Sequence, residues 1–170
     1  MDAPPSLESL YDAHAAGLYH YLTSIVREEG DARDLLQELF IKLAARPLPS
    51  HVGDARAFVF RMAHNLAVDW LRRREVRRGA EQTVKDDAHR LFEPPADPDA
   101  AAFARCVEAA LAELPVEQRT VAWLKLWEGL TFDEIAAAQG IPLNTAASRH
   151  RYAIDKLRSL LRPLYEEIQP

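Results

Sequence analysis

Apolar residues recur at spacings of three and four along most of the chain, and no stretch alternates regularly between polar and apolar residues. Because amphipathic helices produce the first pattern and half-buried strands the second, the sequence predicts an all-α fold. Prolines and glycines divide the pattern into separate helices. The expected helices cover residues 7–26, 31–46, 54–78, 101–113 and 117–128, followed by a helix-turn-helix pair from 131 to about 161.

The apolar stripes of the first three helices predict which side chains form a core. Asp31 is expected to cap the second helix, because it follows Gly30 and its carboxylate can accept from unpaired backbone N–H groups. The side chains expected inside are Leu7, Leu10, Tyr11, Leu18, Leu22 and Ile25 on the first helix, Leu35, Leu36, Leu39, Phe40 and Leu43 on the second, and Phe58, Val59, Met62 and Leu66 on the third.

Residues 79–100 interrupt the helical pattern. They contain three prolines, one glycine, two basic and six acidic side chains, with no sustained apolar period. This composition is typical of a linker rather than of core structure. We therefore expect two small helical domains, residues 1–78 and 101–170, joined by a flexible acidic linker.

The segment that begins at Thr131 has the signals of a helix-turn-helix. Thr131 and Glu134 match a capping box, Gly140 stands where a helix C-cap bends, and Pro142 prevents simple continuation. The second helix of such a motif places its N-terminal residues against bases and phosphates, although an ordinary αα-hairpin is an alternative. Its expected inward side chains are Ala146, His150, Ala153, Ile154 and Leu157, and its outward ones are Ala147, Ser148, Arg151, Tyr152 and Asp155.

The third expected helix ends in a basic cluster. Cations stabilise a helix C-terminus without any ligand, so a solvated end is one interpretation. Phe58, Phe60 and Trp70 on the same helix favour nucleic-acid binding, because aromatic rings beside cations can stack bases. The cluster consists of Arg72, Arg73, Arg74, Arg77 and Arg78.

Composition narrows the class of protein further. A chain of 170 residues with 48% hydrophobic and 28% charged residues is expected to fold, and it has no apolar run of membrane-spanning length. The N-terminus lacks an export leader, and the single Cys106, expected to be buried, cannot form an internal disulfide; both favour a cytoplasmic protein. The six histidines form no zinc motif and no phosphate-binding glycine loop occurs, so we expect no enzyme activity, metal or cofactor.

Four segments together resemble the bacterial RNA polymerase sigma-70 family, most closely its small extracytoplasmic-function (ECF) type. They are "DARDLLQELFIKLA" (31–44), "RAFVFRMAHNLAVDWLRRR" (56–74), "LAELPVEQRTVAWLKLWEGLTFDEIAAAQGIP" (111–142) and "NTAASRHRYAIDKLR" (144–158). The resemblance covers nearly the whole chain, with a region-2-like domain, an acidic linker and a region-4-like domain. It implies a transcription initiation factor that binds core RNA polymerase, through the β′ coiled coil and the β flap, and promoter DNA.

The resemblance also implies roles for individual residues. The linker would run through the polymerase RNA exit channel, the loop 46–55 would help to open the −10 element, and an anti-sigma factor is an expected partner. The residues matching the β′-docking surface are Asp34, Leu35, Gln37, Glu38 and Phe40; those matching the −10 region are Arg61, His64, Asn65, Asp69, Arg72 and Arg73; those matching the −35 reader are Asn144, Thr145, Ala147, Ser148, Arg149, Arg151 and Tyr152.

The chain departs from the family pattern at several of these positions. Asn144 stands where glycine is usual, Ala147 where a basic residue is common, and His64 where arginine is frequent. Two alternatives stay open: a stand-alone helix-turn-helix regulator, and a sigma-like decoy that binds polymerase or an anti-sigma factor without reading promoters. The net charge of −5 does not exclude DNA binding, because the resemblance implies that the polymerase would supply most non-specific phosphate contacts.

Overall fold

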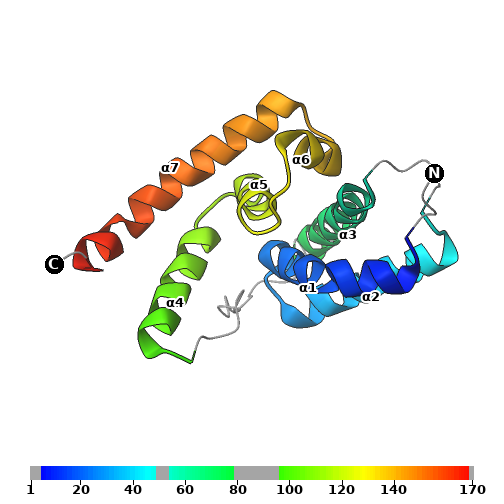
Figure 1. The fold of residues 1–170 in the computed structure, drawn as a ribbon, viewed down its shortest axis with the longest axis horizontal. Coiled ribbons are helices and arrows are strands. Elements are labelled where there is room, and N and C mark those ends of the chain that lie inside the picture. The colour runs from blue at the N-terminus through cyan, green and yellow to red at the C-terminus, as the bar shows by residue number, and fades with distance from the viewer. Residues whose placement is uncertain (1–4, 49–53, 79–95, 169–170) are drawn as a thin grey trace.

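The computed structural model describes residues 5–48, 54–78 and 96–168, and these residues form helices without any strand (Figure 1). The expected all-α fold is therefore confirmed. The helices are α1 (Leu7–Val26), α2 (Glu29–Ala45), α3 (Ala55–Arg78), α4 (Pro98–Ala112), α5 (Val116–Leu126), α6 (Phe132–Gln139) and α7 (Leu143–Ile168).

Helices α1, α2 and α3 pack against one another and form the N-terminal part of the core. Helix α1 starts at the N-cap Ser6, whose hydroxyl accepts from the Ser9 amide at 3.1 Å. Helix α2 begins two residues earlier than expected, because Glu28 in extended conformation precedes it and Asp31 lies inside its first turn. Asp31 is therefore not the N-cap, although its carboxylate still suits the positive end of the helix dipole.

Several side chains expected in the core lie at the surface, and one aromatic ring considered for base stacking is buried. Leu7 and Tyr11 are exposed, although the Tyr11 ring contacts Phe40 of α2 at its edge. Phe60 is fully buried and packs edge-on against Tyr21 at 5.5 Å between ring centroids, so it cannot stack on a nucleic-acid base. Cys106 is exposed on α4, so its expected burial was wrong.

Helices α4 to α7 form the C-terminal part, and the expected helix-turn-helix is confirmed in α6 and α7. Thr131 and Glu134 make both hydrogen bonds of a capping box, and Gly140 ends α6 with a φ of 64°. Helix α4 starts at Pro98, earlier than expected, because proline suits the first turn of a helix and Asp97 accepts from the Asp99 amide at 3.1 Å.

The two halves of the chain pack directly on each other. Helix α6 lies against α3, helix α5 lies against α1, and the buried side chains form one continuous cluster across the boundary (Figure 1). Helix α7 extends away from this junction alongside α4. Of the linker predicted at 79–100, only residues 96–100 belong to the part of the chain that the structure describes.

Candidate docking and nucleic-acid interfaces

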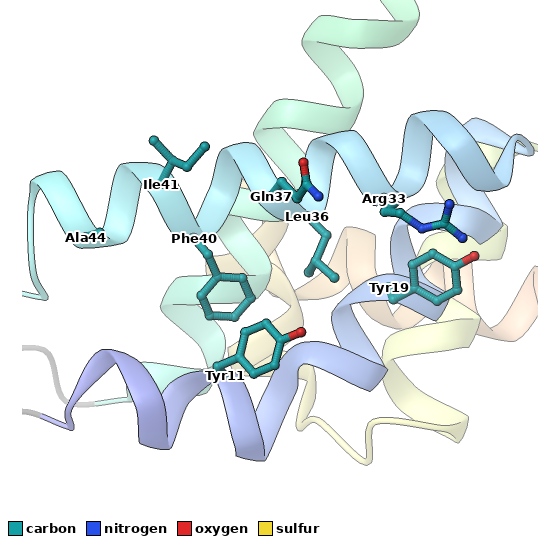
Figure 2. A pocket seen from close by; sticks show the side chains of 8 residues that line it. All are labelled: Tyr11, Tyr19, Arg33, Leu36, Gln37, Phe40, Ile41 and Ala44. Atoms are coloured by element: carbon teal, nitrogen blue, oxygen red, sulfur yellow. The ribbon is translucent and has the colours of Figure 1, made fainter.

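An aromatic groove of about 780 Å³ lies between α1 and α2 (Figure 2). The rings of Tyr11 and Phe40 meet edge-on at 4.9 Å across the two helices, and Arg33 stands beside Tyr19 at the other end. The groove combines a mainly apolar floor with a few polar groups at its edge, which is the usual character of a protein-binding site. Its lining residues are Tyr11, Tyr19, Arg33, Leu36, Gln37, Phe40, Ile41 and Ala44.

The residues predicted for docking divide between this groove and its surroundings. Gln37 and Phe40 line it, whereas Asp34 is exposed elsewhere on α2. Glu38 pairs with Lys42 at 2.7 Å. Leu35 is only 4% exposed and lies in the core, so its side chain is not available to a partner.

Sequence reasoning assigned only two of the eight lining residues, Gln37 and Phe40, to docking. Tyr11 is 53% exposed and Ile41 is 68% exposed, yet both have the residue type of a core position. Helical periodicity shows the direction in which a side chain points but not whether another helix covers it. The sequence signal that could have indicated the groove is the presence of large apolar side chains on two helices that face each other.

A second hollow, of about 460 Å³, lies where α2 ends and α3 passes it. Phe58 and Met62 provide apolar surface there, and Lys42 and Arg46 add positive charge. The hollow borders the loop 46–55 predicted to act at the −10 element, of which residues 49–53 lie outside the described residues. A flat apolar surface beside cations can accept an unstacked base and its phosphate.

The −10 residues predicted on α3 form an exposed stripe. Arg61, Asn65, Asp69 and Arg72 follow one another at spacings of three and four, and Arg73 is adjacent. His64 instead points inward, where its Nδ1 lies 2.9 Å from the Tyr21 hydroxyl. The structure thus separates His64 from the other predicted −10 residues.

Part of the basic end of α3 is engaged within the protein. The guanidinium of Arg74 lies 4.9 Å from the ring centroid of Trp70 and donates to the Val26 carbonyl at 3.3 Å. Arg72, Arg73 and Arg77 remain exposed. These three cations are therefore available to phosphates, whereas Arg74 has a structural role.

Helix α7 presents the predicted −35 residues in two environments. Asn144, Arg151 and Tyr152 are exposed, and the Arg151 guanidinium lies 5.1 Å from the Tyr152 ring centroid. The remaining four are half-buried, and the Ser148 hydroxyl donates to the carbonyl of Thr145 at 3.0 Å. Those four are Thr145, Ala147, Ser148 and Arg149.

Aromatic packing fixes the angle between α6 and α7. The ring of His150 packs edge-on against Phe132 at 5.4 Å, and the ammonium of Lys125 lies 5.0 Å from the same Phe132 ring. Lys125 also donates to the Leu130 carbonyl at 3.0 Å. Burial, followed by the charge of Lys125, lowers the pKa of His150, so the neutral ring is favoured in this packing.

Among the described residues, no group of three or more His, Cys, Asp and Glu side chains is arranged to hold a metal ion. Within the same residues, no helix is both long and apolar enough to cross a membrane.

Comparison with known proteins gives these surfaces a family context. The Sigma-70 region 2 family matches residues 10–77, and the Sigma-70, region 4 family matches residues 104–157. The ECF RNA polymerase sigma factor SigL of Mycobacterium tuberculosis is 32% identical over 93% of this chain and 90% of its own length. The ECF RNA polymerase sigma factor SigX of Bacillus subtilis is 25% identical over 96% of this chain and 87% of its own.

Solved structures share the fold. The sigma factor RpoE of Bartonella quintana, solved with the anti-sigma factor NepR, is 21% identical with a TM-score of 0.77, over 91% of this chain and 96% of its own. CnrH, solved with the cytosolic domain of CnrY, is 23% identical with a TM-score of 0.64, over 92% of this chain and 88% of its own. With its region 2 and region 4 domains in order and SigL similar over 90% of its length, the chain belongs to the ECF sigma factors of the sigma-70 family, transcription initiation factors that direct RNA polymerase to promoters.

Proposed function

We propose that three exposed faces of this chain perform the steps of promoter recognition: the α1–α2 groove docks on polymerase, the α3 stripe opens the −10 element, and the N-terminal half of α7 reads the −35 element. One observation carries the proposal. Most family-matched residues lie on exposed or half-exposed faces of α2, α3 and α7, while their neighbours in the sequence fill the core.

The groove suits the helical coiled coil of the polymerase β′ subunit. A helix can pack apolar side chains against the exposed parts of the Tyr11 and Phe40 rings, as in other helix-in-groove complexes. Arg33 and Gln37 at the edge can hydrogen-bond to polar residues of that helix. Asp34 and Glu38, elsewhere on α2, extend the contact beyond the groove, and Leu35 supports the surface from beneath.

The α3 stripe and the adjacent hollow suit an opened −10 element. Flipping one base out of the duplex costs a few kcal/mol. A base stacked on an apolar surface such as that of Phe58 and Met62 recovers about 1–3 kcal/mol, so the hollow can offset most of the cost. Arg61, Arg72 and Arg73 can follow the single-strand phosphates.

The exposed end of α7 suits the major groove at the −35 element. Arginine can make two hydrogen bonds to the O6 and N7 atoms of guanine, a contact that discriminates by about 1–3 kcal/mol. The Tyr152 ring beside Arg151 restricts the guanidinium and so lowers the entropy lost on binding. Asn144, in the first turn, can donate to a phosphate near the positive helix end.

The remaining assignments follow from this role. The chain catalyses no reaction itself and acts in the cytoplasm, where polymerase is. The α4–α7 domain binds the β flap, and residues 79–100 pass through the RNA exit channel. An anti-sigma factor is a further proposed partner, because RpoE, which shares this fold, is solved with the anti-sigma factor NepR. No relative described above favours a stand-alone regulator or a decoy.

Two variants of the reconstituted holoenzyme test the residue assignments on a promoter selected from a random library. Asn65→Ala should weaken binding to a fork DNA with a single-stranded −10 element, with little change on a −35 duplex. Arg151→Ala should show the opposite selectivity. If both variants weaken both probes equally, the division between α3 and α7 is wrong.

A further inference from the structure

His150 lies on the inner side of α7, among the residues proposed to read the −35 element. Its ring packs edge-on against Phe132 of α6, with 5.4 Å between the ring centroids. The Nε2 atom of His150 is buried and has no hydrogen-bond partner among the described residues. Most buried polar atoms in folded proteins are hydrogen-bonded, so this unpaired nitrogen at a contact between two helices is unusual.

The Phe132 ring is a fixed surface for His150. Lys125 of α5 places its ammonium 5.0 Å from the centroid of the Phe132 ring and donates to the Leu130 carbonyl at 3.0 Å. Leu130 is fully buried, and the capping box of Thr131 fixes the start of α6 directly before Phe132. A change at His150 therefore moves α7 rather than the Phe132 ring.

The position of His150 sets the position of the residues that read DNA, because all of them belong to one rigid helix. Each residue of an α-helix is turned by about 100° from the one before it. Ser148 and Tyr152 are therefore directed about 160° away from His150 around α7, and Arg151 about 100° away. Hydrogen bonds from arginine to guanine need donor–acceptor distances of about 2.9 Å, so a shift of α7 by about 1 Å weakens them.

A positive charge on His150 would be unfavourable in this place. A protonated ring carries an N–H on both nitrogens, and the one on Nε2 would be buried without an acceptor. The Lys125 ammonium and the His150 ring both lie within 5.4 Å of the centroid of the Phe132 ring, so the two charges would repel each other. Arg149 and Arg151, which adjoin His150 in the sequence, add further positive charge on α7.

The helices packed on α7 supply no carboxylate that offsets this charge. These helices are α4, α5 and α6, and Lys125 is the only charged group among the described residues that acts on the His150 ring. Glu134 of α6 is engaged in the capping box, and Asp133 of α6 and Glu113 at the end of α4 are exposed. Burial, followed by the charge of Lys125, accordingly lowers the pKa of His150 below its ordinary value of 6.5.

We infer that His150 is a positioning residue for −35 recognition: its neutral ring against Phe132 sets the place of α7, and a proton on this ring displaces the helix and weakens reading of the −35 element. The contact between the two rings rests on geometry alone, whereas its effect on promoters rests on the function proposed above. The chain therefore reads the −35 element best when the ring is neutral, at pH 7 and above.

This pH dependence has the opposite sign to that of a histidine that contacts DNA directly. Such a histidine gains a proton as the pH falls and tightens binding, because it then neutralises a phosphate. A proton on His150 instead removes molecules from the form that can read the −35 element. At one pH unit below the pKa of His150 about one-tenth of the rings are neutral, so the affinity for −35 DNA falls by up to about tenfold.

The test is the affinity of reconstituted holoenzyme for a duplex that carries the −35 element, measured at constant ionic strength from about pH 8 to about pH 5.5. The parent should bind more weakly as the pH falls. His150→Leu keeps an apolar side chain against Phe132 but cannot be protonated, so its affinity should depend much less on pH. His64→Gln is the matched control, because it removes another inward-facing histidine, on α3, and should keep the pH dependence of the parent.

Lys125→Met is a second variant, which changes the surroundings of the His150 ring without changing the ring. Loss of the ammonium should raise the pKa of His150, which NMR follows through the imidazole proton shifts of the free chain. The pH at which −35 binding is half lost should rise by the same amount. Far-UV circular dichroism of each variant reports whether the helices persist, and loss of helix in the parent over this pH range would overturn the inference.

The outcomes separate this inference from the proposed function. Specific −35 binding with the same pH dependence in the parent and in His150→Leu would overturn the positioning role of His150 while leaving the proposed function intact. A raised pKa of His150 in Lys125→Met without any shift in −35 binding would overturn it as well. Absence of sequence-specific −35 binding by the parent at every pH would instead refute the proposed function, and the inference with it.

Discussion

Ile41 gives a direct test of the α1–α2 groove, because it lines the groove and is 68% exposed. A side chain this exposed adds little to the core, so Ile41→Ala should leave the free energy of unfolding nearly unchanged. The substitution removes three carbon atoms, each worth about 0.8 kcal/mol when fully buried by a partner. Partial burial in the complex gives a loss of about 1–2 kcal/mol in binding.

This loss corresponds to an affinity for core polymerase roughly five- to thirtyfold weaker. The assay is the dissociation constant measured with purified core immobilised on a sensor surface, alongside urea unfolding of the free variant. Val76→Ala is the matched control, because Val76 is 75% exposed on α3, outside the groove. Equal affinities of Ile41→Ala and Val76→Ala for core would refute the assignment of the groove.

Three further predictions concern other parts of the chain. Arg151→Ala should weaken promoter affinity by about 1–3 kcal/mol and so reduce −35-dependent initiation. Arg158→Ala, an exposed change on the same helix, should leave promoter affinity unchanged. Equal losses in the two variants would count against the helix assignment. Burial lowers the pKa of His64 below its ordinary value of 6.5 in the folded chain, so the free energy of unfolding should fall as pH drops below about 6.5. His64→Gln should make the free energy of unfolding depend less on pH in this range, and an unchanged dependence would contradict the buried geometry. Thr131→Ala should destabilise the chain to urea by about 1 kcal/mol through loss of the capping box, and an unchanged midpoint would show that the cap contributes nothing.

The helices could be predicted from the sequence because their signals are local. The capping box at Thr131 and the C-cap at Gly140 depend only on neighbouring residues, and both are present as expected. The apolar stripe of α2 correctly placed Leu39 and Leu43 inside. The N-cap of α2 is Glu28, three residues before the predicted Asp31, because several residues near a helix start can serve as caps.

What periodicity could not supply was which helix covers which face. Tyr11 and Phe60 are both aromatic residues on amphipathic helices, yet one borders an open groove and the other is buried against Tyr21. Leu35 matched the docking motif but points into the core. The carboxylate of Glu128 lies against Gly17 of α1, and this contact depends on packing between segments more than a hundred residues apart, which no local pattern encodes.

Run-off transcription with purified core polymerase and this chain, on promoters selected from a random library, tests the central claim most directly. The account predicts specific transcripts from the combination and none from core alone. Promoters transcribed only after another sigma factor is added would indicate a stand-alone regulator. The absence of any transcript despite core binding would indicate a decoy, and either result would contradict the account.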